Sequence, residues 1–501
     1  MSDANDDPTA RVEEAPTLSR RQFVSAVAPA AAFTILPASV LGRAAGRAAP
    51  SDRITAACVG VGAQGTRVMM DFLKQPDVQV VAVCDVNEGS NNYVEWGANE
   101  LRDKARALLG DSSFSPGVAG CVAGREPARR LVEAYYARPE RSGKYTGCAA
   151  FVDFRELLEK QPDLDAVIVG TPDHAHTVIS IAAMKKGKHV YCQKPLTHSV
   201  EEARRIAEVA RETKVATQVA VGNQASEATR QLCEWIWAGA IGPVRQVLNW
   251  SDRPYWAQGI DRPAGEDPVP AGLDWDLWLG PAPARPYLGL YLPFVWRGWT
   301  DFGTGALGDM GCYSFDTIFR VLKLGAPTHV EASATKSHAE TFPLASVVHF
   351  DFPARGPLPP VRLTWSDGGL KPPRPADVPP EPGLDKDGLL FVGDRGTILC
   401  GFNGAKPRLI PEARMNAFKP PAPTLPRSPG HDREWIDACK GGPVPGANFE
   451  FAGMVTEALL LGNVSLRAEK ELAWDAASHT VSNVPAANAL LRARYRDGWG
   501  I

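Results

Sequence analysis

The sequence predicts an α/β protein whose first domain is built on a parallel sheet. Two observations predict this class. Short apolar runs alternate with helical patterns between residues 54 and 224, and a glycine-rich turn follows the first run. Such runs are typical of strands that helices cover on both faces. Because 501 residues suffice for two domains, we expect a second α/β domain over residues 225–501.

The first apolar run, residues 54–59, leads into Gly60-Val61-Gly62-Ala63-Gln64-Gly65 and then into a helical pattern. This is the order of a dinucleotide-binding βαβ unit, the Rossmann fold. Gly60 permits a sharp turn, Gly62 lets the backbone approach a pyrophosphate, and Gly65 lets the helix pack closely on the strand. We therefore predict that Gly60, Gly62, Ala63, Gln64 and Gly65 bind the cofactor at the helix N-terminus.

Asp85 follows the second apolar run, about twenty residues after the glycines. At this distance a carboxylate can accept hydrogen bonds from the ribose hydroxyls of NAD. Its charge repels the 2′-phosphate of NADP, so we expect NAD rather than NADP. The alternative is that Asp85 only caps the turn that contains Asn87.

Composition excludes several other classes. The net charge is −3 without a basic stripe, which argues against a nucleic-acid partner. No apolar run free of charges and prolines is long enough to span a membrane. The nine cysteines form no C-x-x-C pair, so no metal centre is predicted. Cys58, Cys84 and Cys192 lie in apolar runs and are expected to be buried thiols.

Residues 1–49 carry the pattern of an export signal. Ser19-Arg20-Arg21-Gln22-Phe23-Val24 contains a twin arginine, and an alanine-rich apolar stretch follows. We predict a twin-arginine (Tat) signal and a periplasmic protein. The alternative is a disordered tail that contains two arginines. Because Tat exports folded proteins and no free nicotinamide pool exists outside the cytoplasm, we expect NAD to be tightly bound and recycled on the enzyme.

The alternation of strands and helices is interrupted over residues 88–148. Glycine, serine and proline separate two helical patterns there, which predicts a surface insertion. The alternation then resumes, with apolar runs at residues 166–169, 189–192 and 215–221. We expect the Rossmann domain to span residues 50–224, with this insertion.

Polar side chains follow each of these three later runs. They are Thr171-Pro172-Asp173-His174-Ala175-His176, then Gln193-Lys194-Pro195, then Asn223-Gln224. Parallel strands end at a common edge, which is where ligands bind in open α/β sheets.

Together with the glycine turn and with Gly308-Asp309-Met310-Gly311-Cys312, these turns resemble the Gfo/Idh/MocA oxidoreductases. The resemblance implies an N-terminal Rossmann domain and a C-terminal α/β domain with an open, mostly antiparallel sheet. In the family this sheet often serves as an oligomer interface, so a homo-oligomer, a dimer or tetramer, is expected.

Lys194 is the expected acid/base residue. The resemblance places it beside the nicotinamide, where it transfers a proton to or from the substrate hydroxyl. Near that positive ring, and partly desolvated, a lysine has a lowered pKa. The family usually has Glu before this lysine. Gln193 removes that charge.

Asp309 and Tyr313 lie four residues apart on a predicted helix and so share a face. We expect Asp309 to orient Lys194 or bind sugar hydroxyls; the alternative is a helix cap. The family usually has His at the position of Tyr313. Tyr313 can replace that His with a lowered pKa beside Lys194, leave the base role to Lys194, or mark a loss of dehydrogenase activity.

The remaining candidates are contacts to cofactor and substrate. The resemblance puts Thr171, Pro172, His174 and His176 near the nicotinamide. Two His without a third ligand make a metal site the less favoured interpretation. Asn223 and Gln224 at a strand end are candidate substrate contacts. Trp256, Arg297 and Trp299 are a candidate sugar-stacking wall, with packing as the alternative for each.

These residues predict an exported NAD-dependent oxidoreductase. Hydride would pass between the nicotinamide and a carbinol carbon of a sugar, polyol or glycoside. One alternative is a redox-assisted glycosidase or lyase with recycled NAD. Another is a non-catalytic sugar or nucleotide binder, for which Tyr313 is the main argument.

Overall fold

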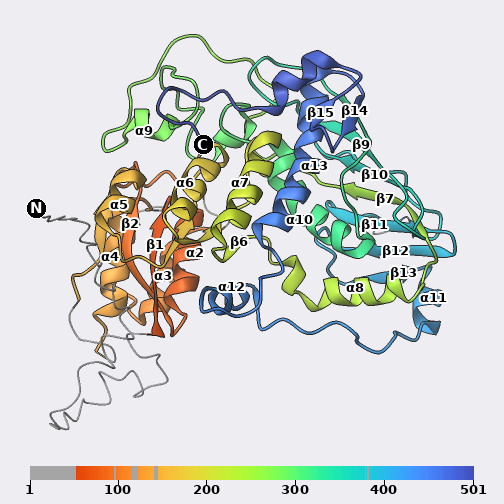
Figure 1. The fold of residues 1–501 in the computed structure, drawn as a ribbon, viewed down its shortest axis with the longest axis horizontal. Helices are drawn as coiled ribbons and strands as arrows, with labels where there is room; N and C mark the ends of the chain where they lie inside the picture. The colour runs from red at the N-terminus through yellow and green to blue at the C-terminus, as the bar shows by residue number, and fades with distance from the viewer. Residues whose placement is uncertain (1–51, 95–96, 115–121, 140–144, 379, 381–382) are drawn as a thin grey trace, which may run out of the picture. The chain divides into compact units, whose positions relative to one another are not determined.

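The computed structural model describes residues 52–94, 97–114, 122–139, 145–378, 380 and 383–501. The expected export signal, residues 1–49, lies outside the described residues. Within them the chain forms two sheets (Figure 1).

The first sheet is parallel, with the strand order β3-β2-β1-β4-β5-β6 of a Rossmann fold. Its strands are β1 (Ile54–Val59), β2 (Val78–Cys84), β3 (Ala149–Phe151), β4 (Ala166–Val169), β5 (His189–Cys192) and β6 (Thr217–Val219). Its helices are α2 (Ala63–Leu73), α3 (Glu100–Leu109), α4 (Arg125–Tyr136), α5 (Phe154–Lys160), α6 (Asp173–Lys185) and α7 (Val200–Thr213). The chain order reverses between β1 and β4, which makes that edge the expected ligand site.

The second sheet has the order β13-β12-β11-β7-β10-β9-β8-β14-β15. Its neighbouring strands are antiparallel except for β7 and β10. The strands are β7 (Val244–Trp250), β8 (His329–Ala334), β9 (Ser346–Phe352), β10 (Val361–Ser366), β11 (Gly388–Gly393), β12 (Gly396–Cys400), β13 (Arg408–Ile410), β14 (Leu472–Asp475) and β15 (Thr480–Val481). This confirms the predicted fold class.

A helical layer lies between the two sheets (Figure 1). Helix α13 (Phe449–Ala468) packs against α7 of the first sheet and against α10 (Gly305–Leu322) of the second. By length and composition α13 could cross a membrane, but 78% of its apolar window is buried inside the protein. It is therefore the core helix that joins the two halves. The other helices are α8 (Glu227–Trp237), α9 (Trp275–Leu279), α11 (Glu412–Ala417) and α12 (His431–Cys439).

Helix α12 returns to the first sheet. Trp435 is fully buried and meets the rings of Phe72 and Tyr191 edge-on, at 5.3 and 5.5 Å between centroids. Arg433 binds Asp77, before β2, at 2.9 Å. The first domain therefore takes up a segment far beyond residue 224, which the predicted boundary did not include.

The insertion was expected to lie at the surface, but two of its residues contact the predicted dinucleotide site. Gly124 donates its N–H to the carbonyl of Val61, inside the glycine turn, at 3.0 Å. Arg125 donates to the carbonyl of Asp85 at 2.7 Å. Gly124 and Arg125 of the insertion thus brace both ends of the predicted dinucleotide site.

Candidate active site

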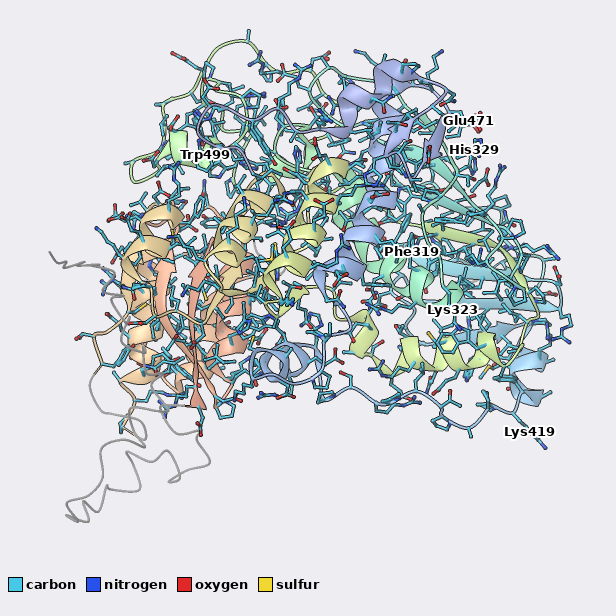
Figure 2. The ribbon with its side chains drawn as sticks, viewed as in Figure 1. Phe319, Lys323, His329, Lys419, Glu471 and Trp499 are labelled. Atoms are coloured by element: carbon cyan, nitrogen blue, oxygen red, sulfur yellow. The ribbon has the colours of Figure 1, made fainter. Side chains whose placement is uncertain are left out.

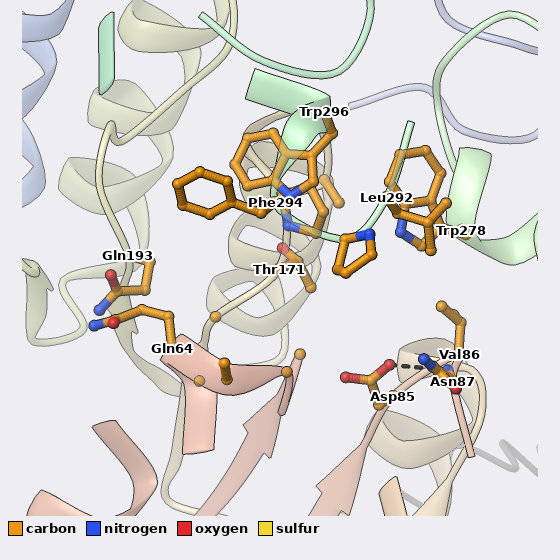
Figure 3. A pocket seen from close by; sticks show the side chains of 18 of the residues that line it. Gln64, Asp85, Val86, Asn87, Thr171, Gln193, Trp278, Leu292, Phe294 and Trp296 are labelled. Carbon is orange, nitrogen blue, oxygen red and sulfur yellow. Dashed lines mark hydrogen bonds between the residues drawn. The ribbon is translucent and has the colours of Figure 1, made fainter. Parts of the chain in front are cut away.

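A cavity of about 400 Å³ opens at the carboxyl edge of the first sheet (Figure 3). Its size suits a small-molecule site. Thirteen of the predicted site residues line it: Gly60, Gly62, Ala63, Gln64, Gly65, Asp85, Thr171, Pro172, Lys194, Trp256, Arg297, Asp309 and Tyr313. The fold thus brings the glycine turn and the expected acid/base group into one space.

The glycine turn is packed too closely for side chains. A Cβ on Gly60, at φ +80°, would lie 2.5 Å from the N atom of Thr171, and one on Gly65 would lie 1.9 Å from the Gly60 carbonyl oxygen. Helix α2 begins at Ala63 without a side-chain cap, and the residues of its first turn line the cavity. This geometry fits a dinucleotide pyrophosphate.

Asp85 fixes the turn as well as facing the cavity. Its carboxylate accepts hydrogen bonds from the N–H groups of Val61, at 2.7 Å, and of Asn87, at 2.9 Å. The contact with Asn87 is drawn in Figure 3. Burial raises the pKa of Asp85, and the two backbone N–H groups oppose that rise. Asp85 therefore does cap the turn that contains Asn87, which was the alternative interpretation, and its side chain also lines the cavity.

Lys194, Asp309 and Arg297 form a buried charged cluster. The Nζ of Lys194 donates to Oδ1 of Asp309 at 2.8 Å and to its carbonyl at 2.9 Å. The Nε of Arg297 donates to the same Oδ1 at 2.9 Å. Asp309 lies inside α10, so it orients Lys194 and does not cap the helix.

The ion pair sets the protonation states of Lys194 and Asp309. Burial acts to lower the pKa of Lys194, but the Asp309 carboxylate outweighs it and the pKa is raised. Burial acts to raise the pKa of Asp309, but Lys194 and Arg297 lower it to about 2. Asp309 thus supplies the negative charge that Gln193 lacks, and the lowering of the Lys194 pKa expected beside a positive nicotinamide stays a prediction.

Tyr313 places its ring beside Lys194, whose Nζ lies 5.0 Å from the ring centroid. Burial raises the pKa of Tyr313, and Lys194 only partly opposes that rise. A fall of the Tyr313 pKa, which one interpretation of the sequence expected, is therefore wrong. Tyr313 is a neutral hydroxyl at the cavity wall.

The two histidines lie behind the cavity. Helix α6 begins at Asp173, so His174 and His176 sit inside its first two turns, fully buried. The ring of His176 bridges the carbonyls of Thr171 and Pro195, at 2.9 and 2.8 Å. The ring of His174 lies between the carbonyls of Phe302 and Trp278. Neither histidine lines the cavity, so the structure does not support their predicted direct contact with the cofactor. Among the described residues there is no cluster of three or more metal ligands.

Three residues that were predicted to contact the substrate, Asn223, Gln224 and Trp299, do not line the cavity. Asn223 donates to the carbonyl of Tyr313 at 2.6 Å, and Gln224 packs against His431. Trp299 is fully buried, with its Nε1 donating to the carbonyl of Leu290. Strand β6 ends at Val219, before Asn223 and Gln224, which lie in a 3-10 turn with their amides bonded to α10 and α12.

Several cavity residues were not predicted. Tyr93, Arg253, Trp278, Phe294, Trp296 and Trp499 line it, and Asp173 lies buried behind it. Trp499 comes from the C-terminal end of the chain and lies between α9 and the first sheet (Figure 2). The tryptophan content of residues 250–299 was a signal for Trp278 and Trp296, whereas no sequence pattern pointed to the others.

Comparison with protein families gives two matches. Residues 122–221 match the model described as the NAD-binding Rossmann fold of the GFO_IDH_MocA oxidoreductase family. Residues 243–353 match the model of the C-terminal alpha/beta domain of the same family. The two segments fall in the first and the second half of the chain.

Curated relatives include sugar dehydrogenases and reductases. A levoglucosan dehydrogenase of Pseudarthrobacter phenanthrenivorans is 33% identical over 20% of this chain and 27% of its own length. A 1,5-anhydro-D-fructose reductase of Ensifer adhaerens is 28% identical over 43% of this chain and 55% of its own. A glycosyl hydrolase family 109 protein of Stenotrophomonas maltophilia is 28% identical over 35% and 29%. Each match spans less than two thirds of the relative.

A solved structure shares the fold. The WlbA dehydrogenase of Bordetella pertussis, in complex with NADH and UDP-GlcNAcA, superposes with a TM-score of 0.51 at 16% identity. The superposition covers 84% of this chain and 99% of that one. Matches in both halves of the chain therefore support its assignment to the Gfo/Idh/MocA oxidoreductase family.

Proposed function

We propose that the protein is an NAD-dependent oxidoreductase that acts on a carbinol carbon of a sugar, polyol or glycoside. One observation carries the proposal: the glycine turn and the Lys194–Asp309 pair line the same cavity. When bound, the nicotinamide would accept or donate the hydride. The named relatives act on sugars and related compounds, which supports the substrate class.

Separate groups of residues in the cavity would bind the cofactor, transfer the proton and bind the sugar. The turn from Gly60 to Gly65 holds the pyrophosphate, and Asp85 receives the ribose hydroxyls and disfavours NADP. Lys194 exchanges the hydroxyl proton at its Nζ, held in place by Asp309. The aromatic residues Trp256 and Trp296 line the cavity, where they can contact a sugar ring.

The protonated Lys194 is ready to donate in the direction of reduction. In the direction of oxidation Nζ must first lose its proton, which the neighbouring Asp309 opposes. A positive nicotinamide would oppose Asp309 and lower this pKa again. The proposed base role thus belongs to the loaded enzyme.

We also propose that NAD is held tightly. Tyr93 of the insertion lies against Gly62, and Trp278 and Trp499 line the cavity from two other segments. Contacts from three separate segments would slow release. An enzyme exported by the Tat route, as the Arg20-Arg21 pattern predicts, would need this retention.

The first experiment is to purify the mature protein, denature it and identify the released nucleotide. NAD or NADH near one per chain supports the proposal. A chain that carries no nucleotide and ignores added NAD contradicts it.

A redox-assisted glycosidase is the second candidate, favoured by the similarity to a glycosyl hydrolase family 109 protein. Product analysis with only enzyme-bound NAD separates the two. Bond cleavage needs no external acceptor, whereas net oxidation stops after one turnover without one. A non-catalytic binder would give neither product.

A further inference from the structure

Arg297 brings an additional positive charge to the Lys194–Asp309 pair. Its Nε and the Nζ of Lys194 contact one oxygen, Oδ1 of Asp309, at 2.9 and 2.8 Å. The side chains of Lys194, Asp309 and Arg297 are 12%, 8% and 16% exposed. Two cations therefore share one carboxylate where water screens them little.

The other charges nearby do not balance the cluster. Asp173 is a further buried carboxyl that interacts with the cluster; burial and Asp309 raise its pKa to about 7, against the pull of Arg297 and Lys194. Arg253 also lines the cavity, but it is paired with Asp252 at 2.8 Å. If the proposed function holds, oxidised nicotinamide adds a third positive group. Around Asp309, three positive groups then meet one paired carboxylate and the buried Asp173.

Arg297 is held so that its unused donors stay available. Its guanidinium carbon lies 4.5 Å from the ring centroid of Phe294 and 4.3 Å from that of Trp296. Nη1 donates to the carbonyl of Phe294 at 3.1 Å, and Nη2 makes no hydrogen bond to any described residue. Phe294 and Trp296 stand at the cavity wall in Figure 3. A stacked, fixed guanidinium with a free edge is suited to a carboxylate.

We propose that the substrate is an anionic sugar, a hexuronate or its glycoside, whose carboxylate binds Arg297 beside the reacting carbinol. This inference rests on the proposed function and names its substrate class. A neutral sugar would leave the excess positive charge of the loaded site uncompensated, at a cost that a low-dielectric cavity makes large.

The test compares each hexuronate with its own methyl ester, which keeps the shape and removes the charge. Reduction of enzyme-bound NAD and the thermal shift of the NAD-loaded protein are measured for both. The acid is expected to exceed the ester in kcat/KM by about 10- to 100-fold, the range of a charged hydrogen bond. Equal values for acid and ester overturn the inference.

Arg297→Gln should remove this preference, and Arg297→Lys should restore part of it. The ratio of acid to ester is the readout, because general damage to the Asp309 cluster affects both compounds. A preference that survives Arg297→Gln would overturn the role of Arg297. If that variant does not fold, the thermal shifts of the wild-type protein by acid and ester decide alone.

The proposed function can fail separately. If no sugar, charged or neutral, reduces bound NAD, the oxidoreductase proposal is contradicted. The thermal shift then still decides whether the cavity selects carboxylates.

Discussion

At the scale of single residues, the Lys194–Asp309 pair is the feature on which the proposed chemistry depends. Lys194→Ala should lower kcat about 10²- to 10⁴-fold, the usual contribution of a general acid or base. NAD binding should persist, because the glycine turn and Asp85 are untouched. Steady-state kinetics and nucleotide titration check both expectations. Lys186→Ala, an exposed lysine at the end of α6, is the matched control; unchanged turnover in Lys194→Ala would disprove the assignment.

Asp173 gives a prediction about pH. Burial raises its pKa from 3.8 to about 7, so between these values the folded protein holds a proton that the unfolded chain releases. The free energy of unfolding must therefore fall as pH rises through this window. The effect is at most about 4 kcal/mol at 1.36 kcal/mol per pKa unit.

Asp173→Asn should remove this dependence. The amide oxygen can still accept the hydrogen bond from Thr304, which lies at 2.8 Å. Thermal melting between pH 5 and 8 should show a smaller loss of Tm in the variant than in the wild type. Parallel melting curves would show that Asp173 is ionised throughout.

The sequence predicted correctly which residues line the cavity where the end of a strand fixes their position. Lys194 and Asp85 both follow strands and both line the cavity. His176 and Trp299 were predicted to contact ligands but do not line the cavity. A position in the sequence does not reveal the direction of a side chain, which tertiary packing decides. Asp173 belongs to the Thr171–His176 turn that the sequence singled out. Its raised pKa could not be predicted, because it depends on burial and on Asp309, which is remote in sequence.

At the scale of elements, the α2 turn depends on close backbone packing. Gly65→Ala would place a Cβ 1.9 Å from the Gly60 carbonyl oxygen, so α2 must move. We expect a loss of about 1–3 kcal/mol of stability from overpacking and a weakened affinity for NAD. Gly97→Ala, with nothing within 4 Å, is the control. Calorimetry and NAD titration of both variants give the answer; equal behaviour would contradict the packing argument.

The elements themselves were predicted well where the apolar pattern is continuous. The runs at residues 54–59, 166–169 and 189–192 are β1, β4 and β5. The short strands β3, β13, β14 and β15 were missed, because runs of two to four residues carry little pattern unless, like β4 and β5, they fall in a regular alternation with helices. The return of α12 was missed because nothing local tells a helix which sheet it will join.

At the scale of the whole molecule, the second sheet has one face turned away from the core helices. Along β9 the residues alternate strictly, with Val348 and Phe350 buried and Val347 and His349 half-buried. Helix α13 packs against β8 and β9. The half-buried face holds Thr364 on β10, hydrogen-bonded to His349 at 3.0 Å. We propose this face as the interface of a homo-oligomer.

Light scattering should then give a dimer or tetramer for the purified protein. Thr364→Arg would place a charge that cannot be paired in the middle of the proposed interface, so the mass should fall toward that of one chain. Thr213→Arg, at the end of α7 in the first half, should leave the mass unchanged. A wild-type protein with the mass of one chain, or a Thr364→Arg variant that still assembles, would show that this sheet face is not the interface.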